Sequence, residues 1–303
     1  MVGIFIINIL NAFIEKLHMN VVCIIAYDGS KFCGFSKQKK DSIKIRYLET
    51  KIQDDTSMGL PYTTKLKMFS QENELLSVAD FFESALKRIG INTHIIASGR
   101  TDKGVHATYQ VINFHTDLTL QQMPLEKMKN LLNQKLSPSV LVRKIFLESN
   151  SFHARFSAKV RTYRYIFTQE DILPFFNPYI AKVQYGNPIL IQQALDSFLG
   201  IHDFSLFKKN GSETKNFVRE IYKATLLEKK LYNIPCCIIH ISANGFLRSQ
   251  VRMMIQACLY VSLAKISLAD LQCQIDNNML LTDKSCVREL APQGGLYLCR
   301  VVY

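Results

Sequence analysis

The sequence predicts a mixed α/β fold, of the α+β kind, built from two lobes. Its 303 residues suffice for two domains, because one domain takes about 150 residues. Short β-branched runs that end in turn residues alternate with segments in which apolar residues recur at helical spacing. Hydrophobic residues make up 48% and charged residues 20% of the chain, which excludes a disordered or collagen-like protein.

The first lobe is predicted to begin with a strand, followed by a helix and further strands. The β-branched run at 21–27 ends at the turn residues Asp28-Gly29-Ser30, as strands often do. Apolar residues recur at helical spacing from 75 to 89 and stop before Gly90, which suits the left-handed end of a helix. The other elements expected here are strands at 94–97, 108–114 and 140–147 and a polar helix at 120–132.

The second lobe is predicted to repeat this pattern of strands and helices. Its first strand, at 160–167, contains Arg161, Tyr163, Tyr165 and Phe167, which share one face because side chains alternate along a strand. The other expected elements are helices at 189–199 and 251–263 and strands at 221–227, 236–242 and 296–302.

We expect a domain boundary near residue 150. An N-terminal lobe at 19–150 contains an insertion at 37–71, where charges mix with little periodicity, as in a long surface loop. A C-terminal lobe covers 151–303. Residues 1–18 are predicted to be an extension, which a translation start at Met19 would remove.

The charge balance favours a polyanionic partner. The chain carries 37 Lys and Arg against 25 Asp and Glu, a net charge of +12, and the excess is spread over both halves. Clustered cations bind nucleic acid because they release counterions from its phosphates.

The cysteines and the apolar start bear on compartment and cofactors. Eight cysteines form no Cys-x-x-Cys pair, which favours a reducing, cytoplasmic location. The apolar run at 4–14 is too short to span a bilayer, so we expect no membrane association. Metal-ligand spacings, a P-loop and a GxGxxG motif are absent from the sequence.

The segment SGRTDKGVHA at 98–107 contains one carboxylate, Asp102, between Arg100 and Lys103. Neighbouring cations hold a carboxylate ionised, as a nucleophile requires. From spacing alone, a glycine-flanked structural turn is the commoner explanation. His106 is interpreted as a packing or hydrogen-bonding residue rather than as a ligand.

Seven blocks of the sequence, in order, resemble the tRNA pseudouridine synthase A family. They run through the chain from about residue 21 to its end, which makes the resemblance specific. The blocks are AYDGSKFCGF, SVADFFESAL, SGRTDKGVHA, FHARFSAKVRTYRYIF, GIHDFSLF, NGFLRSQVRMMI and GLYLCRVVY.

This resemblance implies a fold and an activity. The fold would be two ferredoxin-like lobes with mixed, largely antiparallel sheets around a central cleft. The activity would be isomerisation of uridine to pseudouridine at positions 38 to 40 in the anticodon stem-loop of tRNA, without cofactor or metal. The family also implies a homodimer, in which one tRNA spans both subunits.

The resemblance assigns catalytic roles to three residues of this chain. Asp102 would be the nucleophile that carries the sugar C1′ or the base C6. Tyr163 would stack on the flipped uracil and serve in proton transfer. Arg252 would pair with Asp102 and keep it ionised, although a solvated helix arginine is the alternative.

Three further residues are predicted to contact the substrate. Arg100 is a candidate for insertion among the bases or for a phosphate contact. Leu247 and Val251 would form the apolar floor of the pocket, although Val251 also fits an ordinary core stripe of a helix. Basic residues near these motifs suit phosphate contacts along an RNA stem: Arg155, Lys159, Arg161, Arg164, Lys208, Lys209, Lys215 and Arg219.

The sequence also departs from the family pattern. The usual Gly-Trp-Gln after the first strand reads Gly34-Phe35-Ser36, and the insertion at 37–71 enlarges a loop that approaches the RNA. Two rival functions stay open: a non-catalytic RNA-binding protein on the same scaffold, and an RNA N-glycosylase that would release free uracil.

Overall fold

The computed structural model describes residues 19–36, 76–211, 214–277 and 286–303. The predicted N-terminal extension at 1–18 and the insertion at 37–71 lie outside these described residues.

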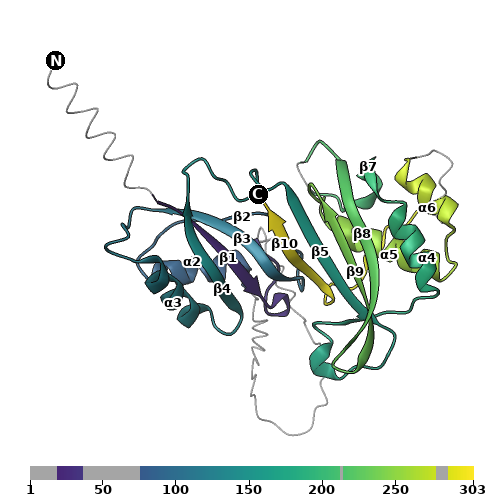
Figure 1. Cartoon of the computed structure of the whole chain (residues 1–303), viewed down its shortest axis with the longest axis horizontal. Coiled ribbons are helices and arrows are strands. Elements are labelled where there is room, and N and C mark those ends of the chain that lie inside the picture. The colour runs from purple at the N-terminus through teal and green to yellow at the C-terminus, as the bar shows by residue number, and fades with distance from the viewer. Residues whose placement is uncertain (1–18, 37–75, 212–213, 278–285) are drawn as a thin grey trace, which may run out of the picture.

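One ten-stranded sheet runs through the whole molecule (Figure 1). Its main path has the order β4-β1-β3-β10-β5-β9-β8-β7, with β2 paired to β3 and β6 paired to β5. The strands are β1 (Met19–Tyr27), β2 (Ile96–Ala97), β3 (His106–Thr116), β4 (Val140–Glu148), β5 (Val160–Thr168), β6 (Ala181–Lys182), β7 (Gly200–Asp203), β8 (Val218–Leu231), β9 (Ile234–Ala243) and β10 (Leu296–Val302). Among these described pairs, only β10 with β3 and β5 with β6 are parallel, so the expected mixed and largely antiparallel fold is confirmed.

The last strand joins the two halves of the sheet. In Figure 1, β10 lies in the middle of the molecule, between β3 of the N-terminal half and β5 of the C-terminal half. Leu298 of β10 is the register partner of both Ala107 and Tyr163. A single hydrophobic cluster contains all three residues and extends into both halves. The two expected lobes therefore share one sheet and one main core.

The helices divide between the two ends of the sheet. Figure 1 shows α2 (Val78–Arg88) and α3 (Leu125–Leu136) beside the N-terminal strands, and α4 (Pro188–Asp196), α5 (Gln250–Ser262) and α6 (Leu268–Ile275) beside the C-terminal strands. Helix α2 begins at residue 78 because the Ser77 side chain accepts a hydrogen bond from the backbone N–H of Asp80, which caps the helix.

Some elements differ from those the sequence predicts. Helix α3 begins at Leu125, after Pro124, because proline fits the start of a helix and not its interior. Strand β2 is two residues long, shorter than the strand expected at 94–97. Helix α6 was not predicted, although Ser267 and Asp270 form a capping box at its start, which is a readable signal.

Candidate active site

Asp102 lies in the loop between β2 and β3, and its partners come from the C-terminal half. Its Oδ2 accepts a hydrogen bond of 2.7 Å from Ser249 Oγ and lies 3.5 Å from Nη1 of Arg252. The Asp102 side chain is 31% exposed and the Arg252 side chain 13%. The structure thus brings the predicted carboxylate and the predicted cation together, at the edge of solvent.

Arg252 is fixed in place by further hydrogen bonds from its guanidinium group. It lies in the first turn of α5, and its Nε donates to the carbonyl oxygen of Ala291 over 2.7 Å. Its Nη2 donates to Oε1 of Gln293 over 3.3 Å. Because these bonds orient the planar guanidinium, Nη1 is left directed at Asp102.

Ser249 is a site residue that the sequence prediction missed. It precedes α5 with a φ of 59°, in the left-handed region, and its side chain makes no capping bond to the helix. This conformation costs a non-glycine residue of order 1–3 kcal/mol, and such strain collects at functional sites. The hydroxyl points instead at Asp102. Its place in the NGFLRSQVRMMI block, three residues before Arg252, was the only sequence signal available.

The loop that carries Asp102 is held by residues of the first strand and the turn after it. The Tyr27 hydroxyl is hydrogen-bonded to Oγ1 of Thr101 over 2.8 Å, and the N–H of Phe35 donates to the carbonyl of Thr101 over 3.0 Å. Gly34 has a φ of 123°, and a Cβ there would lie 3.2 Å from the carbonyl oxygen of Thr101. Glycine at this position therefore allows the two backbones to approach.

Tyr163 lies on β5 with only 9% of its surface exposed. Its ring meets the ring of Phe246 edge to face, with centroids 5.3 Å apart. Burial raises the pKa of Tyr163, and the charge of Asp102 raises it further, while the Arg161 guanidinium works in the opposite direction. The phenol therefore stays protonated at neutral pH and is a hydrogen-bond donor.

The other predicted contact residues differ in exposure. Arg100 is exposed to solvent beside the loop. Leu247 and Val251 are 8% and 5% exposed and belong to the main hydrophobic cluster. Their membership of the core is observed, and the pocket-floor role stays a prediction.

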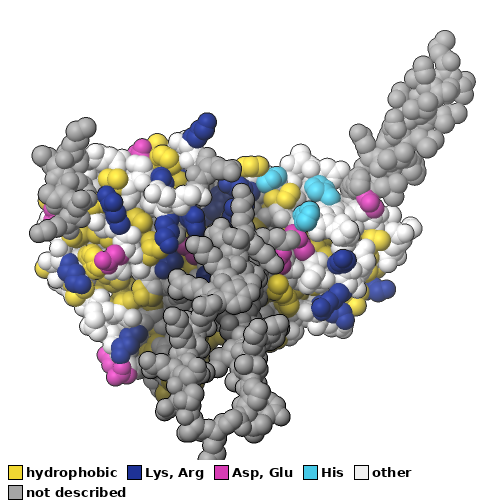
Figure 2. Space-filling model, turned by 180° about the vertical axis from the view of Figure 1, so that it is seen from behind, with side chains coloured by type: hydrophobic (Ala, Val, Ile, Leu, Met, Phe, Trp, Pro, Cys, Tyr) yellow, Lys and Arg dark blue, Asp and Glu magenta, His cyan; other side chains and the backbone are white. Residues whose placement is uncertain are grey.

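The predicted basic cluster is not one patch. Because side chains alternate along β5, Arg161 and Arg164 lie on opposite faces of the strand. Arg161 donates to the carbonyl of Ser98 in the loop that carries Asp102, whereas Arg164 lines a separate open hollow of about 620 Å³ with Lys223, His240 and Arg300. Figure 2, which shows the molecule from behind, has dark blue Lys and Arg side chains spread over both halves of this face.

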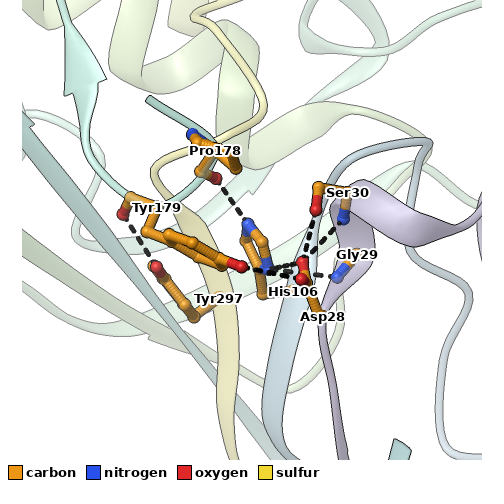
Figure 3. A network of polar contacts seen from close by, with 7 residues as sticks. All are labelled: Asp28, Gly29, Ser30, His106, Pro178, Tyr179 and Tyr297. Carbon is orange, nitrogen blue, oxygen red and sulfur yellow. Dashed lines mark hydrogen bonds and ion pairs between the residues drawn. The ribbon is translucent and has the colours of Figure 1, made fainter. Parts of the chain in front are cut away.

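A polar network around His106, the first residue of β3, connects this strand to the C-terminal half (Figure 3). Nδ1 of His106 accepts from the N–H of Gly29 over 3.0 Å, and Nε2 donates to the carbonyl of Pro178 over 2.6 Å. The Tyr179 hydroxyl donates to Oδ2 of Asp28 over 2.7 Å. The expectation that His106 packs and forms hydrogen bonds is confirmed.

The described residues contain neither a metal-binding cluster nor a membrane-spanning helix. Within them, no three His, Cys, Asp or Glu side chains are placed to hold a metal ion. None of the described helices combines the length and the apolar character needed to cross a membrane.

Comparison with known proteins decides the family. The sequence profile described as tRNA pseudouridine synthase matches residues 23–157 and 194–303. The chain belongs to the tRNA pseudouridine synthase family. Both the Asp102 loop and the Ser249–Arg252 segment lie inside the matched ranges. Membership confirms the resemblance seen in the seven blocks and the expected enzyme class, an isomerase that forms pseudouridine in tRNA.

Individual members of the family match almost over their whole length. A tRNA pseudouridine synthase A of Helicobacter pylori strain P12 is 39% identical over 279 residues, which cover 92% of this chain and 97% of the relative. The protein of the same name from Helicobacter acinonychis is 38% identical, with the same coverage. The one from Helicobacter hepaticus is 36% identical over 282 residues.

Proposed function

We propose that this pseudouridine synthase acts on uridines 38 to 40 in the anticodon stem-loop of tRNA, with Asp102 as the nucleophile. The observation that carries the assignment is the placement of Asp102. It is a carboxylate at the edge of solvent that accepts from Ser249 and Arg252, as an ionised nucleophile requires.

The reaction is an isomerisation that the residues of the site can support without a redox change. Asp102 attacks the sugar C1′ or the base C6, and the N1–C1′ bond breaks. The uracil rotates while it stays bound, a bond forms between C5 and C1′, and the bond to Asp102 breaks, which releases the carboxylate. The proton lost from C5 and the proton gained at N1 balance each other. Tyr163, which burial keeps protonated, donates a hydrogen bond to the base and packs against it.

The substrate class is supported by charge. The net charge of +12 suits phosphate contacts along an RNA stem, and exposed Arg100 lies two residues from Asp102. We also propose that the enzyme is a homodimer and works in the cytoplasm. Buried Cys23, Cys236, Cys237 and Cys258 are free thiols, which suits a reducing compartment.

The test is to incubate unmodified tRNA with the wild type, with Asp102→Ala and with Asp171→Ala, and to map pseudouridine. Asp171 is a matched control because its side chain is 98% exposed and contacts Lys182. We expect pseudouridine at 38 to 40 with the wild type and Asp171→Ala and none with Asp102→Ala.

Other outcomes would contradict specific parts of this assignment. Equal product from Asp102→Ala would exclude Asp102 as the nucleophile. Tight tRNA binding by the wild type with no product would favour the non-catalytic RNA-binding protein. Free uracil with an abasic site would indicate an N-glycosylase. Sedimentation of the protein alone would test the homodimer.

A further inference from the structure

The guanidinium group of Arg161 uses every one of its donors on backbone carbonyls. Nε and Nη2 donate to the carbonyl of Ser98 over 2.9 and 2.7 Å. Nη2 also donates to Arg155 over 2.7 Å, and Nη1 donates to Asn244 over 3.0 Å and to Ala158 over 3.4 Å. A guanidinium has five N–H groups, so five hydrogen bonds leave none for an RNA phosphate.

These carbonyls come from three segments: the loop of Asp102, residues 155–158 before β5, and the turn before α5. Ser98 begins the loop that carries Asp102. Asn244 begins the turn that leads to Phe246, the ring against Tyr163, and then to Ser249. Ser98 and Asn244 are 63 and 83 residues from Arg161 in the chain. Arg161 itself is two residues from Tyr163, on the same face of β5.

Among the described residues, no carboxylate forms an ion pair with Arg161. Burial lowers the pKa of Arg161, while the nearby phenol of Tyr163 acts in the opposite direction. The unperturbed pKa of arginine is so high that the group stays charged. Within the described part of the chain, the cation is therefore stabilised by carbonyl dipoles, and its bonds serve to hold backbone segments together.

We propose that Arg161 is the positioning residue that sets Asp102 and Ser249 relative to Tyr163, which rests on the catalytic roles proposed above. One rigid, planar group joins the loop of the nucleophile, the turn before α5 and the strand of the aromatic residue. The other tethers of this loop come from the N-terminal half: Gln110 donates to the carbonyl of Gly99 and accepts from the Ser98 hydroxyl, and Tyr27 and Phe35 bond to Thr101. None of these bonds ties the loop to the strand of Tyr163 or to the turn before α5.

Lysine cannot replace Arg161 in this role. Its ammonium has three donors on one atom and no planar fork, so it can hold only part of the set of carbonyls. A misplacement of about 1 Å at a reacting centre lowers the rate about a hundredfold. We expect Arg161→Lys to lower the single-turnover rate of pseudouridine formation by about that factor.

The matched control is Arg143→Lys on β4. Arg143 donates to one carbonyl, that of Thr108, and lies over the ring of Tyr109, away from the three segments. We expect it to react at the wild-type rate. Both variants are to be assayed with enzyme in excess and at several salt concentrations. Because lysine keeps the charge, the salt slope is measured with Arg161→Gln. This variant should leave the salt slope of tRNA binding unchanged, whereas loss of a phosphate contact lowers that slope by about 1.

Hydrogen exchange provides a readout that does not depend on activity. In Arg161→Lys we expect faster exchange in peptides that cover 98–104 and 244–249, and no change there in Arg143→Lys. If the wild type makes no pseudouridine, the proposed function fails, and exchange alone decides whether Arg161 holds these segments.

Three results would overturn the positioning role. The first is a folded Arg161→Lys that reacts at the wild-type rate, and the second is unchanged hydrogen exchange in both segments. The third is a lowered salt slope in Arg161→Gln, which would show that Arg161 contacts a phosphate. If Arg161→Lys does not fold, Gln110→Met loosens the same loop and leaves the guanidinium intact. A folded Gln110→Met with the wild-type rate would then show that the loop position does not limit the reaction.

Discussion

The network around His106 predicts a specific pattern of stability in two variants. Because Nδ1 accepts from the N–H of Gly29 and Nε2 donates to the carbonyl of Pro178, the imidazole is neutral, with its proton on Nε2. His106→Asn places an amide oxygen near the position of Nδ1, and His106→Gln places an amide nitrogen near that of Nε2. Each variant therefore keeps one of the two bonds, and neither carries a titrating group.

The magnitudes follow from the burial of each bond. The bond from Gly29 is buried, and an unsatisfied buried N–H costs about 1–3 kcal/mol. The bond to Pro178 is partly buried, and its loss costs about 0.5–1.5 kcal/mol. Both variants also lose the stacking of His106 on Tyr297, with centroids 4.8 Å apart, worth about 0.5–1.5 kcal/mol. We expect losses of about 1.5–4.5 kcal/mol for His106→Gln and about 1–3 kcal/mol for His106→Asn.

The free energy of unfolding of the wild type should also depend on pH, because the pKa of His106 differs between the folded and the unfolded chain. Burial lowers the pKa of His106, although the carbonyl of Pro178 and the carboxylate of Asp28, 3.4 Å away, act against it. In the unfolded chain the histidine titrates near pH 6.5. Below that pH the unfolded state binds a proton that the folded state does not, so the wild type loses stability as pH falls from about 7 towards the folded-state pKa.

The assay is urea unfolding of the wild type and both variants between pH 7.5 and 5. Of the groups around His106, burial raises the pKa of Asp28, but the bonds from Ser30 and Tyr179 together hold it below its usual value. The bond to the Asp28 carboxylate raises the pKa of Tyr179 above its usual value. Neither titrates in this range. The advantage of the wild type should therefore shrink as pH falls. An advantage that grows in acid would show that His106 is protonated and paired with Asp28.

Three other predictions concern the active site and its support. Ser249→Gly removes the hydroxyl bonded to Asp102 and relieves the left-handed φ, so single-turnover assays should show about a tenfold loss of rate, while thermal unfolding shows equal or higher stability. Arg252→Ala should abolish turnover with little loss of tRNA affinity in a filter-binding assay, because Arg252 contacts one carboxylate rather than the RNA stem. Gly29→Ala places a Cβ 2.1 Å from the carbonyl of Val105, so urea unfolding should show a loss of about 1–3 kcal/mol or more.

The sequence predicted the fold where the signal is local. The strand at 296–302 has the predicted bounds, because its apolar run begins directly after the turn residues Gly294 and Gly295. The position of that strand between β3 and β5 was not predictable. It depends on pairing with residues about 130 to 190 positions earlier in the chain, and such pairing leaves no local pattern. The shared sheet followed only from the coordinates.

The active site shows the same division between local and distant signals. Asp102, Tyr163 and Arg252 were predicted because they stand in recognisable blocks of sequence. The sequence did not predict that Ser249 bonds to Asp102 or that Arg161 bonds to the carbonyl of Ser98. A serine gives no sign that its backbone is left-handed, and an arginine in a basic segment gives no sign that its partners are carbonyls.

The contacts around Asp102 connect the two halves of the chain on both sides of β10. Asp102 accepts hydrogen bonds from Ser249 and Arg252 of the C-terminal half. Four residues before Asp102, the carbonyl of Ser98 accepts a hydrogen bond from Arg161. Four residues after Asp102, His106 reaches Pro178. The loop is therefore fastened to the C-terminal half before, at and after its carboxylate. Any motion that separates the halves must break all three contacts together, so the carboxylate and its cation meet only when the shared sheet is complete.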